Sequence, residues 1–197
     1  MTFGKLSLVA SVSLMAALTL GGCTASDPLA EQYRSGDSKN YIAGDGTVTE
    51  FAKENRPLGA DWTGETESGQ QLSNRDLLGK TVVLNFWYAG CAPCRAEIKD
   101  LVALQDQFKS DGVQFVGVNV RDTAATALAF DRTFKVNFPS VMDNETGAVV
   151  LAYTGVVTPQ AVPTTLVIDR EGKITARILG RIDPSTLRSL IETAVGK

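Results

Sequence analysis

Apolar residues along most of the chain occur either in short continuous runs, typical of buried strands, or at helical spacing, and the two patterns follow one another. A nearly continuous apolar run at residues 81–87 is typical of a central strand buried on both faces, and residues 113–120 form a second strand of the same kind. Between the two runs, apolar positions such as Ile98 and Leu101 recur at helical spacing over residues 92–109. The pattern therefore predicts a strand–helix–strand unit in this part of the chain.

Turn and cap signals mark the elements towards the C-terminus. Residues 164–168 and 173–179 are predicted to pair as a hairpin, in which Gly172 supplies a positive φ. Asp183 is a predicted N-cap, with Pro184 at the first position of a last helix. The remaining predicted elements are a short hairpin at 62–72 with Gly69 near its turn, a helix at 124–134 with Thr123 as its N-cap, a helix at 148–153, and an inward stripe of Leu187, Leu190, Ile191 and Ala194 on the last helix. This order predicts an α/β domain with a mixed sheet.

Residues 1–22 have the pattern of an export signal. Lys5 precedes an uncharged run at residues 6–20, and a helix of that length would span about 22 Å, short of the roughly 30 Å hydrocarbon core of a membrane. The run ends in Leu20-Gly21-Gly22-Cys23, which resembles the lipobox of bacterial lipoproteins. That resemblance implies cleavage before Cys23, diacylation of Cys23 and anchoring in a lipid membrane. The alternative is an uncleaved membrane anchor with an incidental cysteine.

Residues 23–56 are expected to form a flexible, lipidated tether ahead of a domain at residues 57–197. The segment is rich in Gly, Ser, Asp, Thr and Lys and shows no sustained periodicity. A flexible chain of this length has a root-mean-square reach of about 30 Å. The alternative is that apolar residues such as Val48 and Phe51 dock part of the segment on the domain.

Composition and charge exclude several classes of function. The chain has 197 residues, 44% of them hydrophobic, and a formal net charge of −3. This balance offers no electrostatic footprint for nucleic acid. The chain contains no histidine, which excludes His-ligated metal sites, Ser-His-Asp triads and histidine pH switches.

The candidate chemistry lies at Cys91 and Cys94, which are spaced C-x-x-C between the first predicted strand and its helix. Unpaired N–H groups and the helix dipole at a helix N-terminus favour the thiolate of Cys91. Cys94 lies one turn deeper and suits the role of resolving thiol. Pro93 costs little in a first helical turn, where N–H groups lack helical partners. The spacing predicts a dithiol oxidoreductase.

Two other uses of this cysteine pair remain open from the residues alone. A purely structural disulfide is one, although closing so short a loop adds little stability. A structural zinc site is the other, but it needs about four ligands. With Cys23 lipidated and histidine absent, only two thiolates remain. We expect neither a metal nor a cofactor.

Two segments carry a resemblance to a known family. Residues 85–97, Asn-Phe-Trp-Tyr-Ala-Gly-Cys-Ala-Pro-Cys-Arg-Ala-Glu, resemble the active-site segment of TlpA/ResA-type thioredoxin-fold lipoproteins. Residues 162–169, Val-Pro-Thr-Thr-Leu-Val-Ile-Asp, resemble the family's second signature. Phe138-Pro139 and Asp143 lie between them, and the similarity covers about residues 57–197. It implies a thioredoxin-like fold, with a central mixed sheet flanked by helices, an N-terminal hairpin and a helical insertion.

The resemblance also implies roles for individual residues. Pro163 corresponds to the family's cis-proline, which would bring the Val162 backbone beside the disulfide so that an extended substrate pairs as an added strand. Glu97 corresponds to an active-site acid. Helical spacing alone places Glu97 near the inward face, where a half-buried carboxylate would have a raised pKa and could move protons. The residues alone leave open that Glu97 is a solvated helix residue.

The residues around the motif agree in part with the family's sequence pattern and depart from it at one position. Asn85 stands where ordinary thioredoxins carry a buried Asp, which leaves Glu97 as the leading acid–base candidate. Trp87 is a candidate substrate-binding residue, although packing beneath the site is its favoured role. Family members usually have a Trp directly before the first cysteine, and here that residue is Gly90. We expect Gly90 to leave Cys91 more open and to remove an aromatic contact surface.

The resemblance implies a thiol–disulfide oxidoreductase anchored on the extracytoplasmic face of the cell membrane. Its expected reaction is ResA-like reduction of the C-x-x-C-H disulfide of apocytochrome c during cytochrome c maturation, with electrons from a membrane thiol carrier of the CcdA kind. The alternative is an oxidase that installs disulfides in secreted proteins. Further alternatives are a thiol peroxidase and a non-catalytic binding module. We expect a monomer with no nucleic-acid partner.

Overall fold

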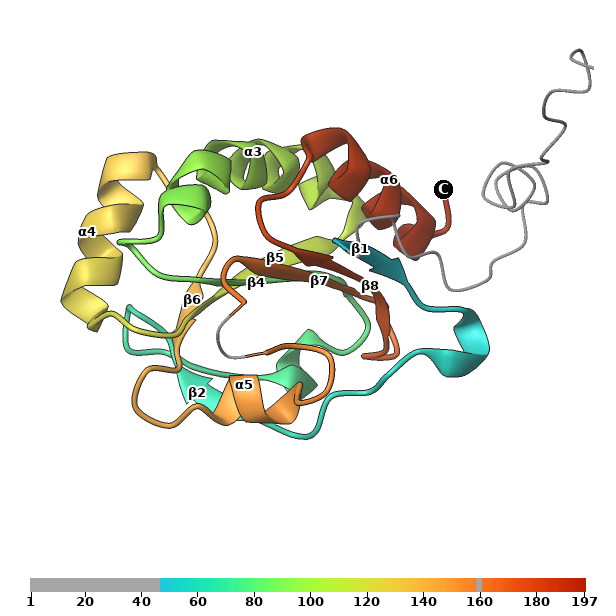
Figure 1. Cartoon of the computed structure of the whole chain (residues 1–197), viewed down its shortest axis with the longest axis horizontal. Helices are drawn as coiled ribbons and strands as arrows, with labels where there is room; N and C mark the ends of the chain where they lie inside the picture. Colours follow the sequence, from blue (N-terminus) through green and yellow to red (C-terminus); the bar gives the residue numbers. More distant parts are fainter. Residues whose placement is uncertain (1–46, 159–160) are drawn as a thin grey trace, which may run out of the picture. The chain divides into compact units, whose positions relative to one another are not determined.

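A six-stranded mixed sheet forms the centre of the domain (Figure 1). The computed structural model describes residues 47–158 and 161–197, so the expected signal peptide, Cys23 and most of the expected tether lie outside the described residues. The strand order is β1-β8-β7-β4-β5-β6. β4 pairs in parallel with β5 and antiparallel with β7, which confirms the predicted mixed sheet. The strands are β1 (Val48–Glu50), β4 (Thr81–Trp87), β5 (Val113–Asn119), β6 (Ser140–Met142), β7 (Thr164–Ile168) and β8 (Ile174–Leu179).

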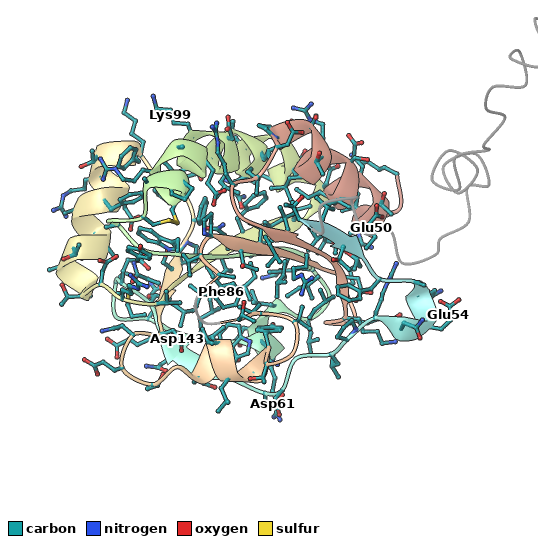
Figure 2. All side chains as sticks on the ribbon, in the orientation of Figure 1. Glu50, Glu54, Asp61, Phe86, Lys99 and Asp143 are labelled. Carbon is teal, nitrogen blue, oxygen red and sulfur yellow. A yellow bond between two sulfur atoms is a disulfide. The ribbon has the colours of Figure 1, made fainter. Side chains whose placement is uncertain are left out.

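The central strand β4 is buried along its whole length, as its continuous apolar run predicts. Its side chains alternate between two cores because successive residues of a strand point to opposite faces. Val83 and Trp87 belong to the core on the side of α3 (Ala92–Phe108) and α6 (Pro184–Val195). Val82, Leu84 and Phe86 belong to the core on the side of the N-terminal hairpin and α5 (Ala148–Ala152). Figure 2 shows Phe86 in the layer between the sheet and α5.

Three helices contribute to the first core and one short helix to the second (Figure 1). The Thr123 side chain accepts the N–H of Thr126 at the start of α4, and Asp183 accepts the N–H of Thr186 at the start of α6. Both predicted caps are therefore present. On α6, Leu187, Leu190 and Ile191 are buried, whereas Ala194 is half-buried. The helices are α3 (Ala92–Phe108), α4 (Ala124–Phe134), α5 (Ala148–Ala152) and α6 (Pro184–Val195), with single 3₁₀ turns η1 (Lys53–Asn55), η2 (Asn74–Leu77) and η3 (Lys109–Asp111).

The predicted N-terminal hairpin is present, and it packs against a strand that the sequence did not predict. Its strands are β2 (Thr63–Glu65) and β3 (Gln71–Ser73), and Gly69 adopts a φ of 81° in the turn. The unpredicted strand β6 pairs in parallel with β5, and its Val141 bridges to Thr66 at the end of the hairpin. A strand of three residues is too short to show the period-two alternation on which the prediction depends.

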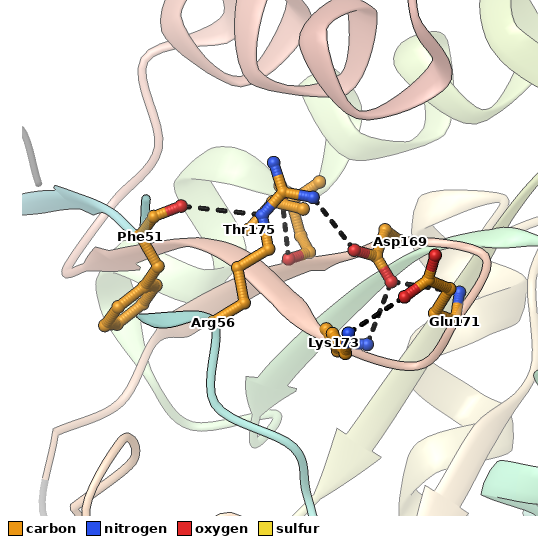
Figure 3. Close-up of polar contacts among 7 residues, drawn as sticks. Phe51, Arg56, Asp169, Glu171, Lys173 and Thr175 are labelled. Atoms are coloured by element: carbon orange, nitrogen blue, oxygen red, sulfur yellow. Dashed lines mark hydrogen bonds and ion pairs between the residues drawn. The ribbon is translucent and has the colours of Figure 1, made fainter. Parts of the chain in front are cut away.

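The end of the segment expected to be a tether forms part of the domain. Its strand β1 pairs antiparallel with β8 at one edge of the sheet. Figure 3 shows how the following residues are held: Arg56 pairs with Asp169 at 3.0 Å, and its Nε donates to the Phe51 carbonyl. The Phe51 N–H donates to the Thr175 carbonyl at 2.8 Å. The docking that Val48 and Phe51 left open is therefore observed, and the domain begins before residue 57.

Candidate active site

The cysteines of the C-x-x-C motif form a disulfide where β4 passes into α3. Their Cα atoms are 5.3 Å apart. Cys91 is the N-cap of α3, and its Sγ accepts the backbone N–H of Cys94 at 3.2 Å. Pro93 lies in the first turn, as expected, where its missing N–H breaks no helical hydrogen bond. The same helix N-terminus would stabilise a Cys91 thiolate after reduction of the disulfide.

A cis peptide bond lies directly beside the disulfide. The bond joins Val162 to Pro163, as the resemblance implied, and Pro163 is the buried residue immediately before β7. The Val162 carbonyl oxygen is 3.9 Å from Cys91 Sγ. The loop thus presents backbone polar groups next to the sulfur that an incoming substrate would approach, which is the arrangement needed for strand addition.

Glu97 lies one turn after Cys94 on α3, and its side chain has no exposed surface. The sequence predicted a half-buried carboxylate, so the burial is deeper than expected. Each carboxylate oxygen accepts one hydrogen bond: Oε1 from Asn85 Nδ2 at 2.9 Å, and Oε2 from the backbone N–H of Ile182 at 2.9 Å. Glu97 therefore ties α3 to β4 and to the loop between β8 and α6.

Burial raises the pKa of Glu97 from its ordinary value of 4.5 to about 7. Desolvation dominates, because it opposes the charged form more strongly than the hydrogen bonds from Ile182 and Asn85 favour it. Two charges have smaller effects on this pKa: the positive charge of Arg181 lowers it, and the negative charge of Asp100 raises it. A carboxyl group with this pKa is close to half-protonated at neutral pH, as a group that exchanges protons needs to be.

Asn85 links Glu97 to the strand that follows the cis-proline. Its side-chain amide donates to Glu97 and also to Thr165 Oγ1 at 3.0 Å, and both Asn85 and Thr165 are buried. The sequence indicated Asn85 by its place in the motif. It could not indicate Thr165 or the Ile182 N–H, because nothing in the local pattern reports a contact 85 residues away.

Trp87 packs beneath the disulfide in the core that contains both cysteines. Only 4% of its surface is exposed, its indole N–H donates to Ser140 Oγ at 3.1 Å, and its ring lies 4.5 Å from that of Phe130. This is the packing role that the sequence favoured. The geometry gives no support to the prediction that Trp87 contacts substrate.

Cys91 is not left open by Gly90, contrary to the expectation from the sequence. Cys91 is only 3% exposed, because Tyr88, Ala89 and Val162 pack against the core that contains it. Gly90 itself is exposed and has no positive φ. A Cβ at this position would lie 3.5 Å from the Tyr88 ring, which is ordinary contact distance.

The loop before Cys91 is held by polar residues that the sequence analysis missed. The Ala89 N–H donates to Asp122 Oδ2 at 2.6 Å, and the same oxygen accepts from Asn119 Nδ2 at 2.8 Å. Asn119 is fully buried at the end of β5, where its Oδ1 accepts the N–H groups of Arg121 and Asp122. The sequence feature that could have indicated this arrangement is Asn119, a polar residue at the end of an otherwise mostly apolar strand.

Within residues 47–158 and 161–197, no three or more acidic, cysteine or histidine side chains gather as a metal site would require. None of the helices in this part of the chain is long and apolar enough to cross a lipid bilayer.

A disulfide at the start of a helix, a cis-proline beside it and a central mixed sheet together define a thioredoxin-fold thiol–disulfide oxidoreductase. The chain belongs to the AhpC/TSA family, whose model matches residues 58–177. Within that family the chain is of the TlpA/ResA-like kind, which confirms the resemblance drawn from its two motifs.

Known proteins agree with this assignment. The chain is 37% identical over 123 residues to the thiol-disulfide oxidoreductase ResA of Bacillus subtilis (strain 168). The aligned region makes up 62% of this chain and 66%, just under two thirds, of that relative. It superimposes on a secreted thiol-disulfide isomerase from Corynebacterium glutamicum with a TM-score of 0.71 and 26% identity, over 81% of this chain and 98% of the other. A DsbF homologue from Corynebacterium diphtheriae gives a TM-score of 0.67 and 28% identity, over 80% and 99% of the two chains.

Proposed function

We propose that this protein is an extracytoplasmic reductant of exported proteins, and that its substrate is the C-x-x-C-H disulfide of apocytochrome c during cytochrome c maturation. The observation that carries the proposal is the placement of Cys91 Sγ, which accepts a helix N-terminal N–H and lies 3.9 Å from the Val162 carbonyl beside cis-Pro163. The identity to ResA supports the choice of substrate.

The proposed reaction begins with the reduced protein. The Cys91 thiolate attacks one sulfur of the substrate disulfide, and the other substrate sulfur leaves as a thiolate and takes up a proton. Cys94 then loses its proton and attacks Cys91 Sγ, which releases the second substrate thiol. Two electrons and two protons reach the substrate, and the Cys91–Cys94 disulfide is restored. A membrane thiol carrier of the CcdA kind would reduce it again.

Glu97 is proposed to accept the proton of Cys94. It follows Cys94 by one helical turn, is fully buried, and has a pKa raised to about 7 by that burial. Water cannot readily take this proton, because both Cys94 and Glu97 are closed off from solvent. Asn85 is proposed to hold the carboxylate in place from β4.

The substrate is proposed to bind as an extended segment along the Val162–Pro163 loop. The partly buried Val162 would supply backbone hydrogen bonds, and Pro163 would fix their direction. Trp87 would support the disulfide from below without touching the substrate.

Anchoring in the cell membrane through acylated Cys23 also stays a proposal, since that residue lies outside the described part of the chain. The lipobox-like sequence supports it. The C. glutamicum relative is described as secreted, which agrees with an extracytoplasmic location. A monomer remains our expectation for the oligomeric state.

The proposed function is tested by offering the reduced protein a synthetic peptide that contains an oxidised C-x-x-C-H sequence. We expect stoichiometric reduction of the peptide, with formation of the Cys91–Cys94 disulfide, and a stable mixed disulfide with the Cys94→Ser variant. A Cys91→Ser variant should be inactive. Absence of any reaction, or turnover of hydrogen peroxide in its place, would show that the proposal is wrong.

A further inference from the structure

The Tyr88 ring lies next to the position that a side chain at residue 90 would take. A Cβ on Gly90 would point at the Tyr88 ring, whose Cε2 lies 3.5 Å from it. The Tyr88 carbonyl accepts the N–H of Cys91 at 3.1 Å, so the ring and the reactive cysteine belong to one tight turn. Tyr88 is half-buried and Gly90 is exposed, which leaves part of the ring available to a partner.

Arg121 lies on the Tyr88 ring. Its guanidinium carbon is 4.2 Å from the ring centroid, a cation–π contact. The backbone of Arg121 is fixed by the buried Asn119, which accepts its N–H at 3.1 Å. Among residues 47–158 and 161–197, no carboxylate pairs with this exposed guanidinium. Its N–H groups are therefore available for an anionic group from outside.

A second guanidinium contacts the same loop. Arg95 Nη1 donates to the Ala89 carbonyl at 3.4 Å, and its guanidinium carbon is 5.0 Å from the Phe134 ring centroid. Arg95 also has no carboxylate partner in the described part of the chain. The nearby Asp122 carboxylate binds the Ala89 N–H and the Asn119 amide, so its hydrogen-bonding capacity is directed into the loop.

We propose that Tyr88, Gly90 and Arg121, with Arg95 contacting the same loop, form a substrate-selecting surface that favours polypeptide disulfides flanked by acidic side chains. This inference rests on the proposed function and deepens it by naming the class of substrate. The aromatic face takes the place of the tryptophan missing at position 90, and the guanidinium adds a preference for carboxylates.

The test compares two peptides, each with one intramolecular disulfide, that differ only in having Glu or Gln on both sides of the cysteine pair. The rate constant for oxidation of the reduced full chain, in non-ionic detergent, is measured with each peptide. Each rate is divided by the rate of the same peptide with uncharged dithiothreitol, which removes the peptide's intrinsic reactivity. We expect the Glu peptide to react about three to five times faster at low ionic strength and the advantage to disappear near 1 M salt.

The Arg121→Gln and Tyr88→Ala variants should each lower this Glu-to-Gln rate ratio towards one. A misfolded loop would slow both peptides alike and leave the ratio unchanged, so the ratio separates selection from structure. Arg170→Gln is the matched control, since it removes an exposed guanidinium beyond the far end of β7, and it should keep the wild-type ratio.

A ratio of one in the wild type, or a wild-type ratio in Arg121→Gln, would overturn the inference while leaving the proposed function intact. If neither peptide is reduced at all, the proposed function fails and the inference fails with it.

Discussion

Glu97 carries an ionisable carboxyl group in a place without any exposed surface. Burial of a carboxylate is tolerated here because Asn85 and the Ile182 N–H each donate to one of its oxygens. The two donors do not fully offset desolvation, and the pKa of Glu97 is therefore raised to about 7. A residue arranged in this way reduces stability at high pH, a cost that agrees with the proton-transfer role proposed for Glu97.

Replacement of Glu97 by Gln should affect both activity and stability. We expect the release of substrate from the Cys91 mixed disulfide to slow by about 100-fold and to lose its pH dependence near 7, because a neutral amide cannot accept the Cys94 proton. Stopped-flow measurement of single-turnover rates between pH 5 and 9 checks this. An unchanged pH profile would exclude Glu97 as the proton acceptor.

The difference in stability between the wild type and Glu97→Gln should change with pH in a definite direction. A carboxyl group whose pKa is higher in the folded than in the unfolded chain stabilises the fold below the unfolded pKa, and that contribution is lost as the pH rises through the folded pKa. From pH 4.5 to about 7, the wild type should lose about 3 kcal/mol of unfolding free energy relative to Glu97→Gln. Urea denaturation at pH 4, 6 and 8 measures this difference. A difference that does not vary with pH would contradict the raised pKa.

Gly117 is required by close packing under the site. A Cβ at this position would lie 2.2 Å from Ser140 Oγ and 2.8 Å from Trp87 Nε1. Gly117→Ala should therefore break the hydrogen bond between these groups and cost about 2 kcal/mol of unfolding free energy. Gly90→Ala is the control, because its Cβ meets only ordinary contacts and should change stability by less than about 0.5 kcal/mol. Equal effects of both substitutions in thermal unfolding would refute the packing argument.

Among the elements, β4 and α3 position the two sulfurs and Glu97. The loop before β7 places the Val162 carbonyl beside Cys91, and the loop after β8 supplies the N–H that binds Glu97. β4 is the strand between β5 and β7 and is buried throughout, so the start of α3 is held against a rigid support. Pro163 lies at the entrance to β7, and Ile182 follows β8. The site is thus assembled around β4, from the adjoining start of α3 and from two segments that come much later in the chain.

The docked segment at the N-terminus depends on the ion pair between Arg56 and Asp169, in which the side chains are 22% and 12% exposed. Arg56→Ala should cost about 1 kcal/mol and speed hydrogen exchange of the Phe51 and Leu179 amides, whose hydrogen bonds join this segment to β8. The exposed pair of Arg75 with Asp61 provides the control, since Arg75→Ala should have almost no effect. Exchange rates unchanged by Arg56→Ala would show that β1 holds without the ion pair.

The sequence predicted most elements of the fold because their patterns are long or sharply capped. β4 shows a continuous apolar run, and α4 and α6 begin at cap residues that the structure confirms. β1 and β6 were missed because three residues carry no readable period and, unlike the equally short β2 and β3, neither is joined to a neighbouring strand by a turn with a glycine signal. At the site, the cysteines, Glu97 and Pro163 were indicated by local motifs. The Ile182 N–H, Thr165 and the Asn119–Asp122 pair were not, because their contacts depend on how the chain folds back.

Across the whole molecule, the direction of electron flow depends on how strongly the fold stabilises the reduced form. A thiol pKa lowered from 8.5 to about 7 shifts the reduction potential at pH 7 by only about 10 mV, whereas a fall to about 3.5 shifts it by roughly 100 mV. In the described part of the chain, Cys91 Sγ accepts one backbone N–H, and the nearby guanidiniums of Arg95 and Arg121 lie on aromatic rings. The reductant role that we propose requires the smaller of these two shifts.

The reduction potential of the Cys91–Cys94 couple tests this account most directly. It is measured by equilibrating the purified protein with dithiothreitol or glutathione buffers and counting alkylated thiols by mass. We predict a value near or below about −250 mV, in the range of thioredoxin. A value near about −120 mV would contradict the account and identify the protein as an enzyme that forms disulfides.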